Sequence, residues 1–382
     1  VLGTIGTQSG RVSMAAYGNE FILVDGLNGW YYNGTTLATI DDTAFPENAE
    51  VIEFIDGFYV ALESESQRFW VSRPYNGSSW DGLDYASSEF LDDNTVNVIV
   101  AKRKMWTLGA LSTEVYYNAG TEFPLQRQAG TELEVGCAAK WSLQYIEDNV
   151  LWLGSYLAGG YAVFNRGAPI STPEIEDEIR QYSRIDDAIG MTYKNGGHTF
   201  YLLKFPEAQK TWAYDFSTGR WHRRGHLNLN TGEQEAVIYD HHIFMFGMHL
   251  VADANGNVYE LTHDAPDENG THIQRRFSFS IPNKSQNMIF IDYLTLDFEV
   301  GETDVATGEF GNNPQCYLDV STDKGRTWTY GLDNDLGSAG QYRNLVRYYS
   351  LGSGTDFRFN LYTSAPIRPK LYGVTLEADV GQ

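Results

Sequence analysis

Short runs of aromatic and aliphatic residues recur six times in this chain, each between polar and glycine-rich segments. Successive runs are roughly 40 to 50 residues apart, which is the repeat length of a β-propeller blade. A second aromatic-rich run follows each of the first ones. The first set comprises residues 21–24, 58–62, 105–108, 150–153, 199–203 and 243–246, and the second comprises 30–32, 69–71, 115–117, 161–164, 212–214 and 258–261. The paired runs predict an all-β fold with a propeller of about six blades.

The repeats occupy residues 1–275, and longer strand-like segments follow them. Pairs such as Asn76-Gly77 and Asn195-Gly196 lie between the runs, and Asn-Gly favours a two-residue hairpin turn. Beyond residue 275, strands are predicted at 288–300, 315–321, 341–351, 356–362 and 370–377. We therefore expect a β-propeller at 1–275 and a separate antiparallel β-sandwich at 276–382.

One helix is predicted within the repeats, at residues 172–189. Ser171 and Glu174 have the spacing of a capping box, and Pro173 suits the first helical turn. Apolar residues then recur at helical spacing, at Ile175, Ile179, Tyr182, Ile185 and Ile189. Their common face predicts a helix that packs on the flank of a blade.

The charge balance excludes a broad basic surface. The chain has 50 acidic and 27 basic residues, a formal net charge of −23, so it lacks the excess of Lys and Arg that neutralises DNA phosphates. The two cysteines, Cys137 and Cys316, are too sparse for a redox or zinc motif, and we expect buried free thiols. No apolar stretch is long enough to predict a membrane span. Because the chain opens at Val1, close to strand-like sequence, we expect an N-terminal portion to be missing.

One motif stands out in the C-terminal part of the chain. Ser321, Asp323, Gly325, Thr327 and Trp328 resemble an Asp-box, S-x-D-x-G-x-T-W. In such a turn the carboxylate accepts hydrogen bonds from backbone amides and the glycine adopts a positive φ. Asp-boxes recur in sialidases and other sugar-cleaving propellers, so the motif keeps a carbohydrate function open. Because only one box is present and it lies outside the repeats, a structural role is favoured.

The basic residues form two clusters, each next to a tryptophan. Lys102, Arg103 and Lys104 make up the first cluster, and the second lies at 220–224 with Arg220, Arg223 and Arg224. In an acidic chain, such clusters suit ion pairs and cation–π contacts with another protein. We expect them to contact neighbouring subunits or other partners.

Neither a metal site nor a cofactor site is predicted. His222, His226, His241 and His242 lack a second ligand pair at a suitable spacing. Asp253, Asn255 and Asn257 alternate as at the start of a calcium loop, but a glutamate at the twelfth position is missing. A hairpin turn is the preferred interpretation of this segment, with a weak, exposed Ca²⁺ site as the alternative.

The segment 170–223 resembles the signature region of the packaged-DNA stabilisation proteins of short-tailed phages, also called tail hub or nozzle proteins. The resemblance rests on I-S-T-P-x-I-E at 170–176, Gly197-His198, Phe205-Pro206, Thr211-Trp212, Tyr214-Asp215 and Trp221-His222. Upstream, G-R-V-S-M-A at 10–15 is also similar. Downstream, similarity continues through the Asp-box to Gly337, Gly340, Tyr342, Arg343, Arg347 and 351–352.

This resemblance implies a non-enzymatic structural protein of the virion tail. It implies a ring, sixfold in the family, below the portal and its adaptor protein, with tail needle, fibre or spike proteins as further partners. Such a ring continues the DNA channel and helps to retain packaged DNA. No catalytic residues are carried across, and the acidic charge suits a lumen through which DNA passes without tight binding. The alternative is a carbohydrate-binding or sialidase-like propeller that acts on host surface glycans.

Overall fold

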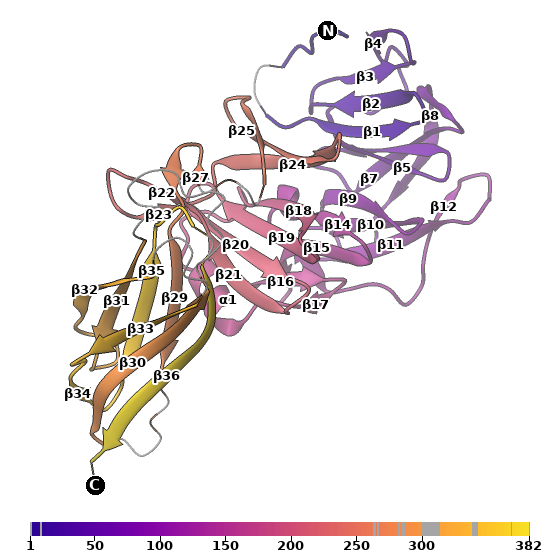
Figure 1. Ribbon diagram of the computed structural model, residues 1–382. Coiled ribbons are helices and arrows are strands. Elements are labelled where there is room, and N and C mark those ends of the chain that lie inside the picture. Colours follow the sequence, from indigo (N-terminus) through magenta and orange to yellow (C-terminus); the bar gives the residue numbers. More distant parts are fainter. Residues whose placement is uncertain are drawn as a thin grey trace. The chain divides into compact units, whose positions relative to one another are not determined.

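The structure is a computed structural model that describes residues 2–7, 10–262, 265, 267–281, 283, 287–299, 314–337, 343–367 and 369–381. The chain forms two compact units (Figure 1). The propeller unit comprises residues 1–224 and 236–259, and the sandwich unit comprises 225–235 and 260–382. The expected boundary between residues 275 and 276 therefore lies inside the second unit. The second unit already begins at residue 260 and also takes in 225–235, and its strand β29 (Arg275–Ser280) pairs with β35 (Arg358–Thr363).

Six antiparallel sheets build the propeller unit. The first holds β1 (Ser13–Tyr17), β2 (Glu20–Val24), β3 (Gly29–Tyr32) and β4 (Leu37–Thr39); the second holds β5 (Ala49–Ile55), β6 (Phe58–Glu63), β7 (Arg68–Arg73) and β8 (Asn76–Ser87); the third holds β9 (Thr95–Ala101), β10 (Lys104–Gly109), β11 (Thr113–Asn118) and β12 (Leu125–Arg127).

The remaining sheets follow the same up-and-down order, with small variations. The fourth holds β13 (Val135–Cys137), β14 (Gln144–Ile146), β15 (Asn149–Tyr156), β16 (Tyr161–Asn165) and β17 (Ala168–Pro169), with the short helix η1 (Lys140–Ser142); the fifth holds β18 (Ile189–Asn195), β19 (His198–Phe205), β20 (Lys210–Asp215) and β21 (Arg220–Arg224); the sixth holds β24 (Tyr239–Met245), β25 (Met248–Asp253) and β26 (Val258–Glu260).

The repeated apolar runs lie on strands whose side chains are buried between neighbouring sheets. Five runs of the first set fall in the second strand of a blade, such as β6, or in the corresponding β15 of the fourth sheet. Consecutive sheets then pack through these residues: Tyr59 against Ile22, and Trp152 against Leu108, in clusters whose side chains are almost fully buried. Strands that are buried on both faces between neighbouring sheets suit the radially repeated sheets of a propeller, and the predicted propeller is confirmed.

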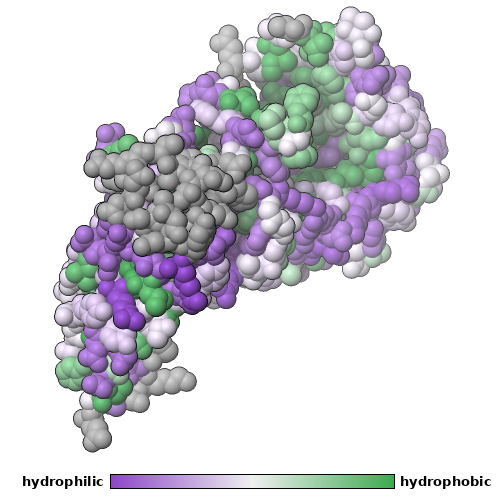
Figure 2. Space-filling view, in the orientation of Figure 1, coloured by the Kyte–Doolittle hydropathy of each residue, from purple (hydrophilic) through white to green (hydrophobic). Residues whose placement is uncertain are grey.

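The sixth sheet departs from this pattern. Its apolar run lies in β24 and the following turn, and Phe244 and Phe246 are 61% and 82% exposed. Figure 2 shows apolar residues at the surface of the propeller unit. The sequence repeat thus identifies a strand here without showing whether its side chains are buried.

The predicted helix at 172–189 is wrong in length. The helix α1 ends early, spanning Pro173–Ile179, and its N-cap is Thr172. Ser171 does not form the expected capping box, because its hydroxyl donates to Glu176 Oε1 at 2.8 Å. Ile175 and Ile179 are buried in the core, while Tyr182 and Ile185 reach the same cluster from the turns that follow. Apolar spacing alone therefore did not distinguish a long helix from a short helix followed by turns.

The sandwich unit has two antiparallel sheets. One contains β29, β35, β31 (Gln315–Ser321) and β32 (Thr329–Asp335); the other contains β33 (Asn344–Tyr349), β30 (Ile289–Glu299), β34 (Ser353–Gly354) and β36 (Lys370–Val380); two small hairpins, β22 (His226–Leu227) with β23 (Gln234–Glu235) and β27 (Asp267–Glu268) with β28 (Thr271–His272), complete the unit. Leu294 and Leu296 on β30 are fully buried against Leu318 and Phe359. Their alternation with partly exposed neighbours is typical of a half-buried strand, and the predicted β-sandwich is confirmed.

Across the described ranges, no helix has both the length and the apolar character needed to cross a membrane.

Candidate functional site

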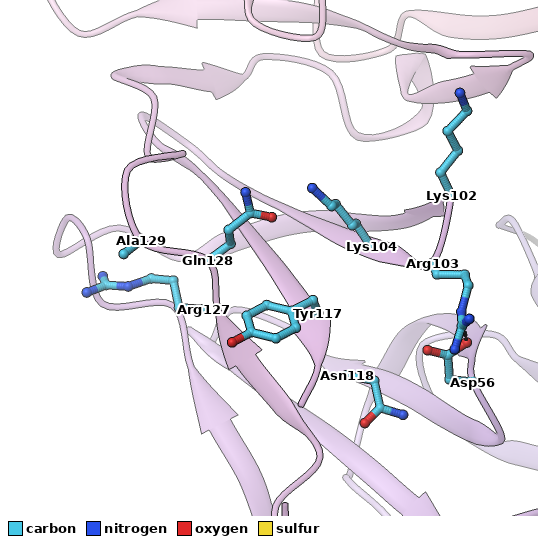
Figure 3. Close-up of a pocket in the computed structure, with 9 residues that line it drawn as sticks. All are labelled: Asp56, Lys102, Arg103, Lys104, Tyr117, Asn118, Arg127, Gln128 and Ala129. Atoms are coloured by element: carbon cyan, nitrogen blue, oxygen red, sulfur yellow. Dashed lines mark hydrogen bonds and ion pairs between the residues drawn. The ribbon is translucent and has the colours of Figure 1, made fainter. Parts of the chain in front are cut away.

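The first basic cluster borders a pocket of about 600 Å³ in the propeller unit (Figure 3). Lys102 and Arg103 form the turn between β9 and β10, and Lys104 begins β10. The other lining residues come from the turn after β5 and from the ends of β11 and β12: Asp56, Tyr117, Asn118, Arg127, Gln128 and Ala129. Four cationic side chains from two segments thus border one pocket in a strongly acidic chain.

The turn that presents Lys102 and Arg103 has an unusual composition. Lys104 pairs with Ala101, so the hairpin loop has two residues, and their φ angles are 50° and 60°. A turn with two positive φ angles normally carries Asn-Gly or Asp-Gly, because a Cβ atom disfavours this conformation. Among the described residues, every other pair of consecutive positive φ angles includes a glycine, as in Asp56-Gly57 and Arg166-Gly167. The backbone of the Lys102-Arg103 turn is therefore strained, and the turn places two cations at a hairpin tip.

The cations of the pocket are only partly neutralised. Arg103 Nε lies 2.8 Å from Asp56 Oδ1, which raises the pKa of Arg103, yet the Arg103 side chain is 81% exposed. Lys102 pairs with Asp148, and Arg127 lies 3.7 Å from Glu132. Lys104 has no ion-pair partner in the part of the chain that the structure describes. Charged donors are therefore available to a bound anion.

The second basic cluster lies on β21 and is engaged within the fold. The Arg223 guanidinium lies 4.2 Å from the centre of the Trp212 ring, and it also pairs with Glu178. The Arg224 guanidinium lies 4.5 Å from the centre of the Phe200 ring. It also donates to the hydroxyl of Tyr193. The structure places the two clusters in different sheets, the third and the fifth, and their predicted role in subunit contacts stays a prediction.

His222 is held neutral by its neighbours. Arg224 Nε donates to His222 Nε2 at 3.1 Å, which requires an unprotonated ring nitrogen. Burial, together with the charge of Arg224, lowers the pKa of His222 to about 4. His242 instead lies 2.9 Å from His249. Within the described ranges, no group of three or more His, Cys, Asp or Glu residues is placed to hold a metal ion.

The Asp-box forms the turn between β31 and β32 in the sandwich unit. Asp323 Oδ1 accepts hydrogen bonds from the amides of Arg326 and Thr327, at 3.0 and 2.8 Å, and Oδ2 accepts from the Thr327 hydroxyl at 2.7 Å. These bonds lower the pKa of Asp323 to about 2. Gly325 has a φ of 88°, and Trp328 Nε1 donates to its carbonyl oxygen. Both carboxylate oxygens are thus occupied within the turn.

The turn at Asp253 uses its carboxylate in a similar way. Asp253 Oδ1 accepts from the amides of Asn255 and Asn257, both at 2.9 Å, and Oδ2 accepts from the Tyr259 hydroxyl at 3.1 Å. These hydrogen bonds, led by that from the Asn257 side chain, lower the pKa of Asp253 to about 2. A Ca²⁺ ion would have to displace these bonds, so the hairpin interpretation fits the geometry better.

Both cysteines are buried free thiols, as the sequence predicts. Burial raises the pKa of Cys137 to about 12 and that of Cys316 to about 11. A thiol with such a pKa carries little thiolate at neutral pH and is a poor nucleophile. These residues contribute packing and not reactivity.

The sequence did not indicate a partly buried ion pair that joins β5 of the second sheet to η1 of the fourth. Lys140 of η1 pairs with Glu50, and burial lowers the pKa of Lys140 to about 8. The guanidinium of Arg11 lies 5.3 Å from the centre of the Trp141 ring. The only signal in the sequence is a charged residue within an apolar strand at Glu50, and its partner is 90 positions away.

Comparisons with solved structures give only distant likenesses. An exo-β-1,3-galactanase from Phanerochaete chrysosporium is 9% identical with a TM-score of 0.34, covering 97% of this chain and 96% of the enzyme. Sqt1 of Saccharomyces cerevisiae is 12% identical with a TM-score of 0.39, covering 65% and 81%. Hsv2 of Kluyveromyces lactis is 9% identical with a TM-score of 0.35, covering 63% and 70%. Likenesses this weak carry no conclusion about function.

No curated protein matches the chain. A family model does match, over residues 1–265, and its description is "Bacteriophage P22 Gp10, beta-propeller". The match covers the six sheets described above and the segment from which the sequence resemblance was drawn. The chain therefore belongs to the phage stabilisation family of P22 Gp10, a family of phage structural proteins.

Proposed function

We propose that this protein is a subunit of the tail hub or nozzle of a short-tailed phage. In this role it forms a ring, sixfold as in the resemblance, that continues the DNA channel below the portal and adaptor and helps to retain packaged DNA. The observation that carries the proposal is the family match over the propeller, residues 1–265. The protein acts as a scaffold, without a cofactor, in the virion tail.

The charge of the chain supports passage of DNA without tight binding. At a net charge of −23, a wall made of many subunits repels the duplex, whereas each neutralised phosphate would add affinity. The basic residues do not contradict this, since Arg223 and Arg224 stack on aromatic rings and Lys102 and Arg103 pair with carboxylates. DNA can therefore slide through the ring.

Electron microscopy of the intact particle tests the proposal directly. We expect antibody fragments against the sandwich unit to label a ring on the tail axis, between the head and the distal tip. Label on peripheral appendages would contradict a hub. The same particles, disrupted gently, should release rings of this chain and not monomers.

The carbohydrate alternative makes a different prediction at the Asp-box. Since Asp323 is occupied by hydrogen bonds within its own turn, Asp323→Ala should lower the melting temperature of the sandwich unit by several degrees. Thr322→Ala, in the same turn, serves as the control. A variant that melts like the wild type but loses binding to host glycans would instead support the carbohydrate function.

A further inference from the structure

We infer that the pocket around Lys102, Arg103 and Lys104 is a binding site for an acidic, extended segment of another protein. The site is defined by the two-residue turn, by Arg127 on the opposite strand, and by Tyr117 between them (Figure 3). This goes beyond the tail role proposed above, because it assigns a ligand chemistry to one pocket. It rests on the proposed function only for the place in the particle at which such a partner is encountered.

The cations of the pocket suit a ligand whose carboxylates are separated along an extended chain. Arg103 pairs with Asp56 at 2.8 Å and Lys102 pairs with Asp148, whereas Arg127 lies 3.7 Å from Glu132 and 4.0 Å from Glu114. The cationic side chains of these pairs are at least 43% exposed, and ion pairs that reach solvent are worth little and exchange readily. A ligand carboxylate can therefore join Lys104 and displace a loose internal partner without breaking the fold.

The same surroundings disfavour nucleic acid. Asp56, Asp148, Glu114 and Glu132 lie within ion-pair distance of the cations, so closely spaced phosphates would meet as many negative as positive groups. Duplex DNA needs an extended basic surface that neutralises many closely spaced phosphates. A pocket of about 600 Å³ accommodates a few side chains instead.

Uncharged groups in the pocket suit a peptide. Tyr117 is 38% exposed and offers a ring face to an aliphatic side chain. Asn118 and Gln128 carry amides that can donate to and accept from a peptide backbone. A second pocket of similar volume, lined by Tyr17, Asn19, Glu20 and Tyr75 among others, has no cation in its lining. The combination of cations, amides and an aromatic ring thus distinguishes the first pocket from the second.

The strained turn provides an independent reason to assign a function to this place. Asn-Gly would satisfy the two positive φ angles of residues 102 and 103 with less strain. The double substitution Lys102→Asn, Arg103→Gly should therefore raise the melting temperature of the chain. We expect it to weaken ligand binding at least about tenfold, which corresponds to about 1.4 kcal/mol. Strain that is relieved only at the expense of binding is a property of functional sites.

Binding is measured with the whole chain by fluorescence anisotropy. The probe is a labelled octapeptide of alternating glutamate and valine, and its control has glutamine in place of glutamate. We expect saturable binding of the glutamate peptide that weakens with added salt, and at least tenfold weaker binding of the control. Lys104→Gln should weaken binding to a similar degree without changing the melting temperature. Arg166→Asn, in a comparable turn that keeps its glycine, should leave affinity unchanged.

Several outcomes would overturn the inference. They are equal binding of both peptides, tighter saturable binding of a 12-base-pair duplex than of the peptide, displacement of the peptide by millimolar inorganic phosphate alone, and affinity that is insensitive to Lys104. If the double variant loses binding because it no longer folds, the Lys104→Gln variant still tests the inference. Lys104 has no ion pair among the described residues, so its substitution should leave the fold intact. A chain that binds the peptide but is absent from the tail axis would contradict the proposed function and leave this inference standing.

Discussion

The two basic clusters look alike in the sequence but differ in the fold. Lys102, Arg103 and Lys104 lie on a hairpin tip with their side chains exposed, and Lys102 and Arg103 each pair with one carboxylate. Arg223 and Arg224 lie on β21 and cover aromatic rings of the same blade. The first cluster is available to a partner, whereas the second is part of the packing of the fifth sheet.

This difference separates charge that serves binding from charge that serves stability. A guanidinium on an aromatic ring contributes through its planar face and its apolar stem, so its removal leaves a surface of the fold uncovered. A cation at a hairpin tip is held by one exposed ion pair, which contributes little. Substitutions in the two clusters should therefore have separable effects.

The largest expected effect is on stability, from the second cluster. Arg224→Ala removes contacts with Phe200 and a hydrogen bond to Tyr193, and we expect the free energy of unfolding of the propeller unit to fall by about 1–3 kcal/mol. Denaturant unfolding followed by tryptophan fluorescence measures it. Lys104→Ala is the matched variant in the first cluster and should unfold like the wild type. Equal losses of unfolding free energy in both variants would show that the two clusters do not differ in their contribution to stability.

A pH dependence should follow from His222. Its pKa falls from 6.5 in the unfolded chain to about 4 in the fold, so the folded state binds fewer protons between these values. The contribution of neutral His222 to the free energy of unfolding is therefore fully present above pH 6.5 and is lost as the pH falls towards 4. The slope should stay below about 1.4 kcal/mol per pH unit, because the partly exposed ring is screened by solvent.

His222→Gln tests this assignment. Its melting temperature should vary less with pH between 6.5 and 4 than that of the wild type, whereas Lys104→Gln should keep the wild-type profile. Parallel profiles for the wild type and His222→Gln would show that the hydrogen bond from Arg224 does not hold the ring neutral.

The smallest effect is expected at the ion pair of the first cluster. Asp56→Asn removes the carboxylate beside Arg103, and because the arginine is almost fully in solvent we expect a change in melting temperature of no more than about 2 °C. The same variant should bind an acidic peptide slightly more tightly, since an internal competitor is gone. A large loss of stability would place the pair among the structural contacts.

The sequence predicted those parts of the molecule that depend on short-range patterns. Apolar runs identified strands in both units, because a strand buries its apolar side chains on one face or, between neighbouring sheets of the propeller, on both faces. The Asp-box turn could also be read in advance, since every hydrogen bond to Asp323 comes from within a few residues. The prediction of a long helix was wrong for the converse reason: Ile185 continues the steps of three or four residues from Ile175 through Ile179 and Tyr182, but turns bring it to the same core.

The candidate site depended on contacts between distant segments. Nothing in the run Lys102-Arg103-Lys104 predicts the positive φ angles, which follow from the pairing of β9 with β10. Its neighbours Asp56 and Arg127 come from other hairpins, and the rings of Tyr193 and Phe200 that cover Arg224 lie on separate strands. The sequence by itself determined which segments are strands, which turns close on themselves and to which family the chain has affinity. Only the tertiary structure decided which cations remain in solvent, because burial of a long charged side chain depends on the packing of residues that are far apart along the chain.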